Sequence, residues 1–140
     1  MVKDIVNGIV AMLEATYGED IHIYTDGVQN ELTMPCFLVK LIKGSRKQMM
    51  SNRLYLEHSF DIQYFPGTVN KNSEISEIVP GLSALEYIMS DGKLLRGTKM
   101  NYEITEEILH FYVQYNCFAY TSKEESDKMQ SFNVKSDLRN

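Results

Sequence analysis

The sequence is poor in the patterns that mark several classes of protein. Its two cysteines, Cys36 and Cys117, lie in the apolar runs PCFLV and NCFAY without C-x-x-C spacing. Such cysteines are typical of buried thiols, and a disulfide would require their two strands to be neighbours. No apolar stretch approaches the ~20 residues that span a bilayer, and the opening MVKDIVNGIV lacks the continuous apolar run of a signal peptide. We therefore expect no metal, no membrane segment and no leader.

Positive charge is also scarce. The formal net charge is −5, whereas nucleic-acid-binding domains usually carry a basic excess. Five of the fourteen Lys and Arg residues nevertheless fall in one short window: Lys40, Lys43, Arg46, Lys47 and Arg53. Such a window binds nucleic acid or an acidic partner surface, or it is simply a solvated loop. Composition alone does not choose between these alternatives.

The chain has enough apolar residues for one folded domain. It has 140 residues, of which 44% are hydrophobic, and a chain of this size buries roughly two thirds of its unfolded surface. From residue 121 onward the sequence is polar with few apolar anchors. We expect a single domain over residues 1–120 and a polar tail over residues 121–140 that is flexible or becomes ordered on a partner.

The spacing of apolar residues predicts the secondary structure. A helical period runs over residues 2–17 and ends at Gly18. Strands are predicted over 21–25, 36–43 and 54–65, and the polar segment 44–53 is predicted to be a loop or an extended hairpin tip. A second helix is predicted over 73–89, kinked or split where Pro80 removes a backbone donor.

Two further strands, 93–104 and 108–120, are expected to form a hairpin around a short turn. In the first of them Met100, Tyr102 and Ile104 are expected to point inward. The resulting order is α-β-β-β-α-β-β. It predicts an α+β fold with two helices packed on a largely antiparallel sheet of about five strands.

The stretch GKLLRGTK (92–99) is close to the phosphate-binding pattern G-x-x-x-x-G-K-[ST], with the last two residues exchanged. A phosphate-binding loop must follow a strand and open a helix, whereas this stretch follows a predicted helix and runs into a strand. We therefore interpret it as architectural. Gly97 is expected at a bulge or at a close approach of backbones, with Arg96 and Lys99 on opposite faces of the strand.

Catalytic patterns are absent from the sequence. His22, His58 and His110 fall in three different predicted strands, without the spacing of a metal site. His58 is expected to be a hydrogen-bonded core histidine, and His110 to lie at the surface or an interface. The serines lack the G-x-S-x-G context of a nucleophile. We expect neither an enzyme nor a cofactor.

Aromatic side chains occur on both faces of the predicted strands. Tyr55 and Phe65 share one outer face, and Tyr112, Phe118 and Tyr120 share another. Exposed aromatic groups in such numbers mark interfaces, unless one of the two helices covers them. The sequence leaves both alternatives open.

Five segments carry a resemblance to a known family: PCFLV (35–39), NRLYLEHSFDIQYFP (52–66), LEYI (85–88), DGKLLRGTKMNYEI (91–104) and LHFYVQYNCF (109–118). Together and in this order they resemble the phage tail terminator proteins of phages and prophages from Gram-positive hosts. The resemblance extends to about Tyr120 and does not include the polar tail. Pro80-Gly81 departs from the more continuous helix expected in relatives.

The resemblance implies an α+β protein that forms a ring, commonly a hexamer, on the head-proximal end of the tail tube. Such a ring would stop polymerisation of the tube protein and present the docking surface for the head connector, while DNA passes through its lumen. The implied partners are other copies of the chain, the tail tube protein and a head-completion or connector protein. The implied location is the host cytoplasm during assembly and then the virion tail.

A closed ring needs one patch of a subunit to meet a different patch on its neighbour. The basic window, the outer strand faces and GKLLRGTK supply our candidates for contacts between subunits or with the tube: Lys43, Arg46, Lys47, Arg53, Tyr55, Arg96, Lys99 and Tyr112. Two other interpretations stay open. One is a head-side stopper or another neck protein, and the other is a non-phage binding module for a peptide or nucleic acid.

Overall fold

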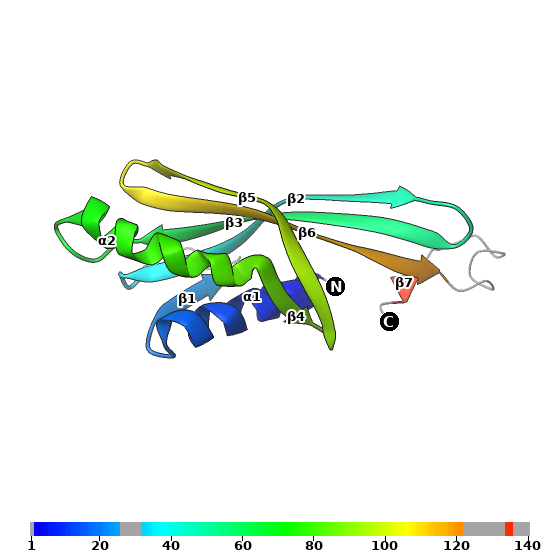
Figure 1. Cartoon of the computed structure of the whole chain (residues 1–140), viewed down its shortest axis with the longest axis horizontal. Helices are drawn as coiled ribbons and strands as arrows, with labels where there is room; N and C mark the ends of the chain where they lie inside the picture. The colour runs from blue at the N-terminus through cyan, green and yellow to red at the C-terminus, as the bar shows by residue number, and fades with distance from the viewer. Residues whose placement is uncertain (1, 26–31, 122–133, 136–140) are drawn as a thin grey trace.

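The computed structural model of the chain describes residues 2–25, 32–121 and 134–135. Two α-helices, a 3-10 helix and the strands of one curled sheet are arranged as Figure 1 shows. In chain order the elements are α1 (Val2–Tyr17), β1 (His22–Thr25), β2 (Cys36–Gln48), β3 (Arg53–Phe65), α2 (Lys71–Ile78), the 3-10 helix η1 (Val79–Glu86), β4 (Tyr87–Ser90), β5 (Lys93–Thr105), β6 (Ile108–Thr121) and β7 (Val134–Lys135).

The sheet runs in the order β1-β2-β3-β6-β5-β4, and the two-residue β7 pairs with the end of β6. The β1–β2 pair is parallel, while the pairs β2–β3, β3–β6, β5–β6 and β4–β5 are antiparallel. The predicted α+β fold with a largely antiparallel sheet is therefore confirmed. Its strand count differs from the prediction because β4 and β7 add strands that we did not expect.

One face of the sheet packs against the helices, and the opposite face carries none of them (Figure 1). We call these the inner and the outer face. The clean alternation predicted for β3 is confirmed, because Leu54, Leu56, Phe60 and Ile62 are buried on the inner face. The main core joins side chains of α1, α2, η1 and the strands: Ile5, Ile9, Leu13, Phe37, Val39, Phe60, Ile62, Tyr64, Ile75, Leu82, Leu85, Ile88, Leu95, Leu109, Phe111, Val113 and Tyr115.

The second predicted helix is correct only in its first part. The α-helix ends at Ile78 and continues as η1, and from Tyr87 the backbone is extended and forms β4. Pro80 lies at the start of η1, where its missing amide breaks the α-helical pattern. The expected split is confirmed, but the prediction of helix for residues 87–89 was wrong.

The basic segment 44–53 is an extended hairpin tip, so the alternative of a loop was wrong. Strand β2 continues to Gln48 and β3 begins at Arg53. Figure 1 shows this hairpin extending past the helices. We call residues 43–56 the β2–β3 arm. The inner face of the arm has a small apolar cluster of its own, made by Leu54, Leu56 and Ala119, separate from the main core.

Tyr102 and Ile104 lie on the inner face of the sheet, as predicted, but the expectation that this position would bury them was wrong. Their register partners in β6 are Phe111 and Leu109, both buried on the inner face. Tyr102 and Ile104 themselves stay 53% and 47% exposed. The reason is that β4 pairs only with Lys93–Arg96, so this part of β5 is a margin of the sheet.

The expectation of a flexible or partner-ordered tail over residues 121–140 lies outside the described residues, apart from Thr121 at the end of β6 and the short β7. None of the helices that the structure describes is long and apolar enough to span a membrane.

Candidate assembly interface

The outer face of the sheet brings polar residues of distant sequence segments together. In the antiparallel register, Ser59 of β3 lies between Lys43 of β2 and Gln114 of β6, and Gln114 in turn pairs with Thr98 of β5. These residues occupy the outward positions of strands whose inward positions build the core. Alternation along each strand and the register between strands therefore produce a continuous polar surface.

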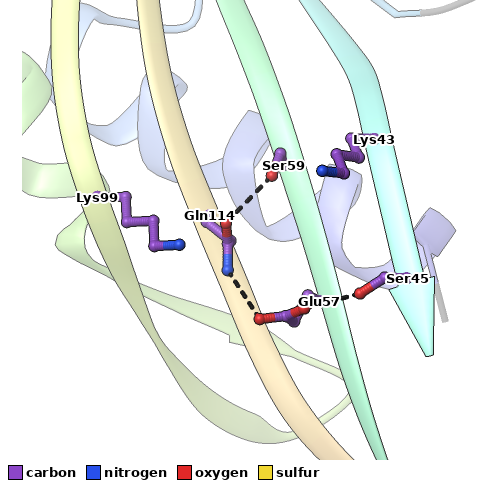
Figure 2. A pocket seen from close by; sticks show the side chains of 6 residues that line it. All are labelled: Lys43, Ser45, Glu57, Ser59, Lys99 and Gln114. Carbon is purple, nitrogen blue, oxygen red and sulfur yellow. Dashed lines mark hydrogen bonds between the residues drawn. The ribbon is translucent and has the colours of Figure 1, made fainter. Parts of the chain in front are cut away.

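A shallow pocket lies at the centre of this face, lined by Lys43, Ser45, Glu57, Ser59, Lys99 and Gln114 (Figure 2). The Ser45 hydroxyl donates a hydrogen bond of 2.7 Å to one oxygen of Glu57, and the Gln114 amide donates one of 3.4 Å to the other. The Ser59 hydroxyl donates to the Gln114 oxygen at 3.2 Å. This network holds the Glu57 carboxylate in the lining of the pocket.

Lysines surround this carboxylate. Figure 2 shows Lys43 and Lys99 reaching over the pocket from opposite sides, and Lys47 Nζ lies 3.7 Å from Glu57. The hydrogen bond from Ser45 lowers the pKa of Glu57, and the charges of Lys47 and Lys99 lower it further. Glu57 is therefore ionised at neutral pH, and its single negative charge is outnumbered by the cations beside it. The pocket can receive an anionic or hydrogen-bonding group of a partner surface.

The outer face of the β2–β3 arm carries an aromatic and cationic cluster. The Arg53 guanidinium lies 4.3 Å from the centroid of the Phe118 ring, and the rings of Tyr55 and Phe118 are 5.1 Å apart. Phe118 and Tyr120 remain 43% and 50% exposed. None of the helices among the described residues covers this face (Figure 1), so the alternative in which the two helices bury the outer aromatic groups was wrong for Phe118 and Tyr120. Exposed aromatic groups beside arginine are typical of protein interfaces.

The structure separates the eight predicted interface residues into groups. Lys43 and Lys99 meet at the central pocket, and Lys47, Arg53 and Tyr55 lie on the outer face of the arm. The other three lie elsewhere in the fold. Nothing in this arrangement tests which of the eight contacts a partner, so their interface role stays a prediction.

The remaining candidates are Arg46, Arg96 and Tyr112. Arg46 pairs with Leu56 in the register and so stands on the inner side of the arm. Arg96 Nε lies 3.3 Å from Glu86 Oε2, on the β4–β5 hairpin. The Tyr112 hydroxyl donates a 2.7 Å hydrogen bond to Glu103, which together with partial burial raises the pKa of Tyr112 to about 12.

The sequence did not single out Glu57, Ser45 and Gln114, which hold the pocket together. They lie in three different strands, and only the cross-strand register brings them together. The available signal was the run of polar residues at alternate positions of 54–65 and 108–120, which predicts a solvated face but no particular pairing.

GKLLRGTK has no features of a phosphate loop. Gly92 has a φ of +77° in the turn between β4 and β5, and Gly97 is buried within β5. The close approach expected at Gly97 is confirmed, since an added Cβ would lie 2.7 Å from a Val113 methyl group and 3.1 Å from the Leu85 carbonyl oxygen. The bulge lies slightly later, around Lys99, whose φ is +54°.

The two strand histidines differ in setting. His58 is buried as expected, but its Nδ1 has no hydrogen-bond partner within the described residues. Burial lowers the pKa of His58, and a hydrogen bond with the Tyr115 backbone only partly offsets this effect. On the outer face, His110 Nδ1 lies 3.0 Å from Asp61, which is itself 7% exposed.

Comparison with known proteins places the chain in a family. A search of curated proteins gave no match. A family model described as "Phage tail terminator protein" matches residues 4–127. That range includes α1 from Asp4 onward, both helices of the 71–86 segment and every strand of the sheet from β1 to β6. The chain therefore belongs to the phage tail terminator family.

Proposed function

We propose that this protein is a ring-forming tail terminator that caps the tail tube, stops its polymerisation and presents the surface to which the head connector docks. Its family is a structural family of the phage tail, whose members associate with tail and head–tail proteins in the virion. The ring, the capping step and the docking step are what we add to that family role.

The observation that carries the proposal is the one-sidedness of the sheet. Helices cover the inner face, while the outer face presents the central pocket and the aromatic cluster of the arm to solvent (Figures 1 and 2). Large side chains such as Phe118 and Tyr120 are costly to leave exposed in a monomer. A surface of this composition fits a protein that works by assembly.

Termination then follows from differential binding. One face of the ring complements the last ring of tube protein, and the opposite face offers no surface that another tube subunit recognises. The tube stops growing because the terminator binds its end more tightly than the next tube subunit does. The same exposed face is then available to the head-side partner.

Electron microscopy of negatively stained tails tests the proposal. In the absence of this protein, tails should become longer and heterogeneous in length, and fail to join heads. A pull-down should recover the tube protein with the wild-type chain. Tails of unchanged length with normal head joining would contradict the proposal, and recovery of head-side proteins alone would point to a neck protein instead.

A charge-reversed pocket makes the test specific to the outer face. The variant Lys43→Glu with Lys99→Glu should reduce recovery of the tube protein, because three carboxylates would then meet in the pocket. Lys3→Glu with Lys71→Glu makes the same change of net charge on α1 and α2 and should leave recovery unchanged. Equal recovery with both double variants would exclude the pocket from the tube interface.

A further inference from the structure

The tip of the β2–β3 arm is a cationic surface. Between Gly44 and Leu56 there are three basic residues, Arg46, Lys47 and Arg53, and no acidic one, while Lys47 also lies 3.7 Å from Glu57. The tip is ordered by Gln48, whose side-chain amide donates hydrogen bonds to the Ser51 oxygen at 3.1 Å and the Arg53 oxygen at 3.3 Å. At its end Met50 is 86% exposed. The tip therefore offers positive charge around an apolar point.

The turn between β5 and β6 is the chemical complement of that tip. Between Met100 and Leu109 there are three carboxylates, Glu103, Glu106 and Glu107, and no basic residue. Beside these carboxylates the side chains of Tyr102 and Ile104 stay about half exposed. We call residues 102–107 the acidic hairpin. It offers negative charge around apolar groups.

The backbone of the acidic hairpin suggests that its carboxylates serve a purpose outside the fold. Glu106 and Glu107 have φ values of +55° and +65°. Two-residue turns of this kind favour Asn-Gly or Asp-Gly, because larger residues are strained at positive φ. Strained backbone of this kind often marks functional positions. Here it holds two carboxylates in the turn at the end of the β5–β6 hairpin.

The two surfaces lie at opposite ends of the molecule. Strand β3 runs between them, with Arg53 paired to Tyr120 at the arm and Tyr64 paired to Leu109 beside the acidic hairpin. At 3.3 Å per residue the 13-residue strand separates them by about 40 Å. Figure 1 shows the arm tip and the β5–β6 turn at opposite ends of the long axis. Each surface therefore needs another molecule to meet its complement.

We infer that the cationic arm tip of one copy docks on the acidic hairpin of the next copy, and that this head-to-tail contact closes the ring. The inference rests on the proposed function, because two different patches that complement each other form a heterologous interface, and a heterologous interface closes into a ring when its rotation permits. Met50 meets the apolar groups Tyr102 and Ile104, while the surrounding charges select the partner and its orientation.

Two charge-reversal variants test this contact. The first, the basic-to-acidic variant, combines Arg46→Glu with Lys47→Glu. The second, the acidic-to-basic variant, combines Glu106→Lys with Glu107→Lys. In either one alone, like charges would face each other at every junction. We expect assembly, measured by native mass spectrometry in solution and by occupancy of tail-tube ends, to weaken by at least about tenfold for each variant.

Mixing the two variants in equal amounts should restore assembly. The acidic tip of the first variant meets the basic hairpin of the second, and the basic tip of the second meets the acidic hairpin of the first. The restored oligomers should contain both variants in a one-to-one ratio. Restored assembly would also exclude misfolding as the cause of the defect in each single variant, because unfolded chains would not restore each other's assembly.

Matched controls reverse the same number of charges elsewhere. Glu19→Lys with Asp20→Lys changes the exposed loop after α1, and Lys3→Glu with Lys71→Glu changes α1 and α2. Both should assemble like the wild type. Wild-type assembly by either charge-reversal variant alone would overturn the inference, and so would a failure of the mixture to restore assembly. Binding of an oligonucleotide to the arm tip in place of a second copy would also overturn it.

The tail-length measurement separates this inference from the function that it rests on. Variants that still assemble, together with tails of normal length, would refute the arm-to-hairpin contact and leave the terminator role intact. Tails whose length does not depend on the protein at all would refute the terminator role itself.

Discussion

At Gly97, strand β5 passes so close to its neighbours that a side chain has no room. An added Cβ would lie 2.7 Å from a methyl group of Val113 and 3.1 Å from the backbone oxygen of Leu85. The Leu85 carbonyl oxygen also accepts a hydrogen bond of 2.5 Å from the buried Tyr115 hydroxyl. This bond holds η1 in place, so η1 cannot easily move away from a side chain added at residue 97. We predict that Gly97→Ala lowers the free energy of unfolding by roughly 1–3 kcal/mol, the usual cost of overpacking.

Gly44 gives the matched control in strand β2. A Cβ there meets nothing closer than 3.8 Å, and its φ is not positive. Gly44→Ala should therefore change stability by no more than about 0.5 kcal/mol, as is usual at open positions. Urea titration of both variants measures the difference, and equal stability of the two would refute the close approach at Gly97.

His58 predicts how stability depends on pH. Burial lowers its pKa in the folded state, while in the unfolded chain a histidine takes up its proton near pH 6.5. As the pH falls below about 6.5, the histidine becomes protonated in the unfolded chain before it does in the folded protein. The unfolded state is therefore stabilised by proton binding, and the free energy of unfolding decreases. The contribution of neutral His58 to the free energy of unfolding is therefore fully present above pH 6.5 and is lost on acidification.

The variant His58→Leu should flatten this dependence between pH 7 and pH 5. Replacement of the exposed His22 by Gln is the control, and should leave the slope as in the wild type. Urea unfolding at several pH values measures both slopes. The carboxylates with lowered pKa, Glu57 and Glu74, titrate below this window. An unchanged slope in His58→Leu would show that another group is responsible.

Helix α1 closes one margin of the sheet. Its residue Gly8 lies directly against the backbone of β4, where an added Cβ would be 2.3 Å from the Met89 oxygen. Because Met89 belongs to the last strand of the sheet, this contact covers an edge that would otherwise be open to pairing with other chains. The glycine thus lets the helix approach the strand.

We predict that Gly8→Ala destabilises the protein although alanine favours helix formation by about 1 kcal/mol over glycine. The added methyl group would clash with the backbone of β4 and force α1 away from it. The packing energy lost between α1 and β4 should exceed the energy gained from the higher helix propensity of alanine. Asn7→Ala, at the neighbouring exposed position of the same helix, is the control and should stabilise slightly. Thermal unfolding of the two variants is the measurement, and a more stable Gly8→Ala would contradict the contact.

Elements with a regular apolar period were predictable from the sequence. Helix α1 and the two faces of β3 follow directly from spacing, because each buries one side against the core. Tyr87–Ser90 was missed, since YIMS continues the apolar spacing of the helix and only pairing with Lys93–Arg96 makes it a strand. The central pocket was missed for a related reason: the positions of Ser45, Glu57 and Gln114 depend on register, which the sequence does not state.

In the molecule as a whole, the β2–β3 arm packs separately from the main core. Its cluster of Leu54, Leu56 and Ala119 is distinct from the main core, and the tip residues 49–52 are held by local hydrogen bonds such as that from the Met49 amide to the Arg53 oxygen at 2.8 Å. The arm can therefore change without loss of the main core. This separation makes it possible to test assembly independently of folding.

The tip-replacement variant exchanges residues 49–53 for Asn-Gly, a two-residue turn that preserves the pairing of Gln48 with Leu54. We predict a free energy of unfolding within about 1 kcal/mol of the wild type, the range of surface changes. Assembly should fail, because the variant lacks Met50 and Arg53. Urea titration measures the first quantity, and the length of tails assembled with the variant measures the second. Loss of cooperative unfolding would mean that the tip supports the core, whereas normal tail lengths would place the assembly contacts elsewhere on the outer face.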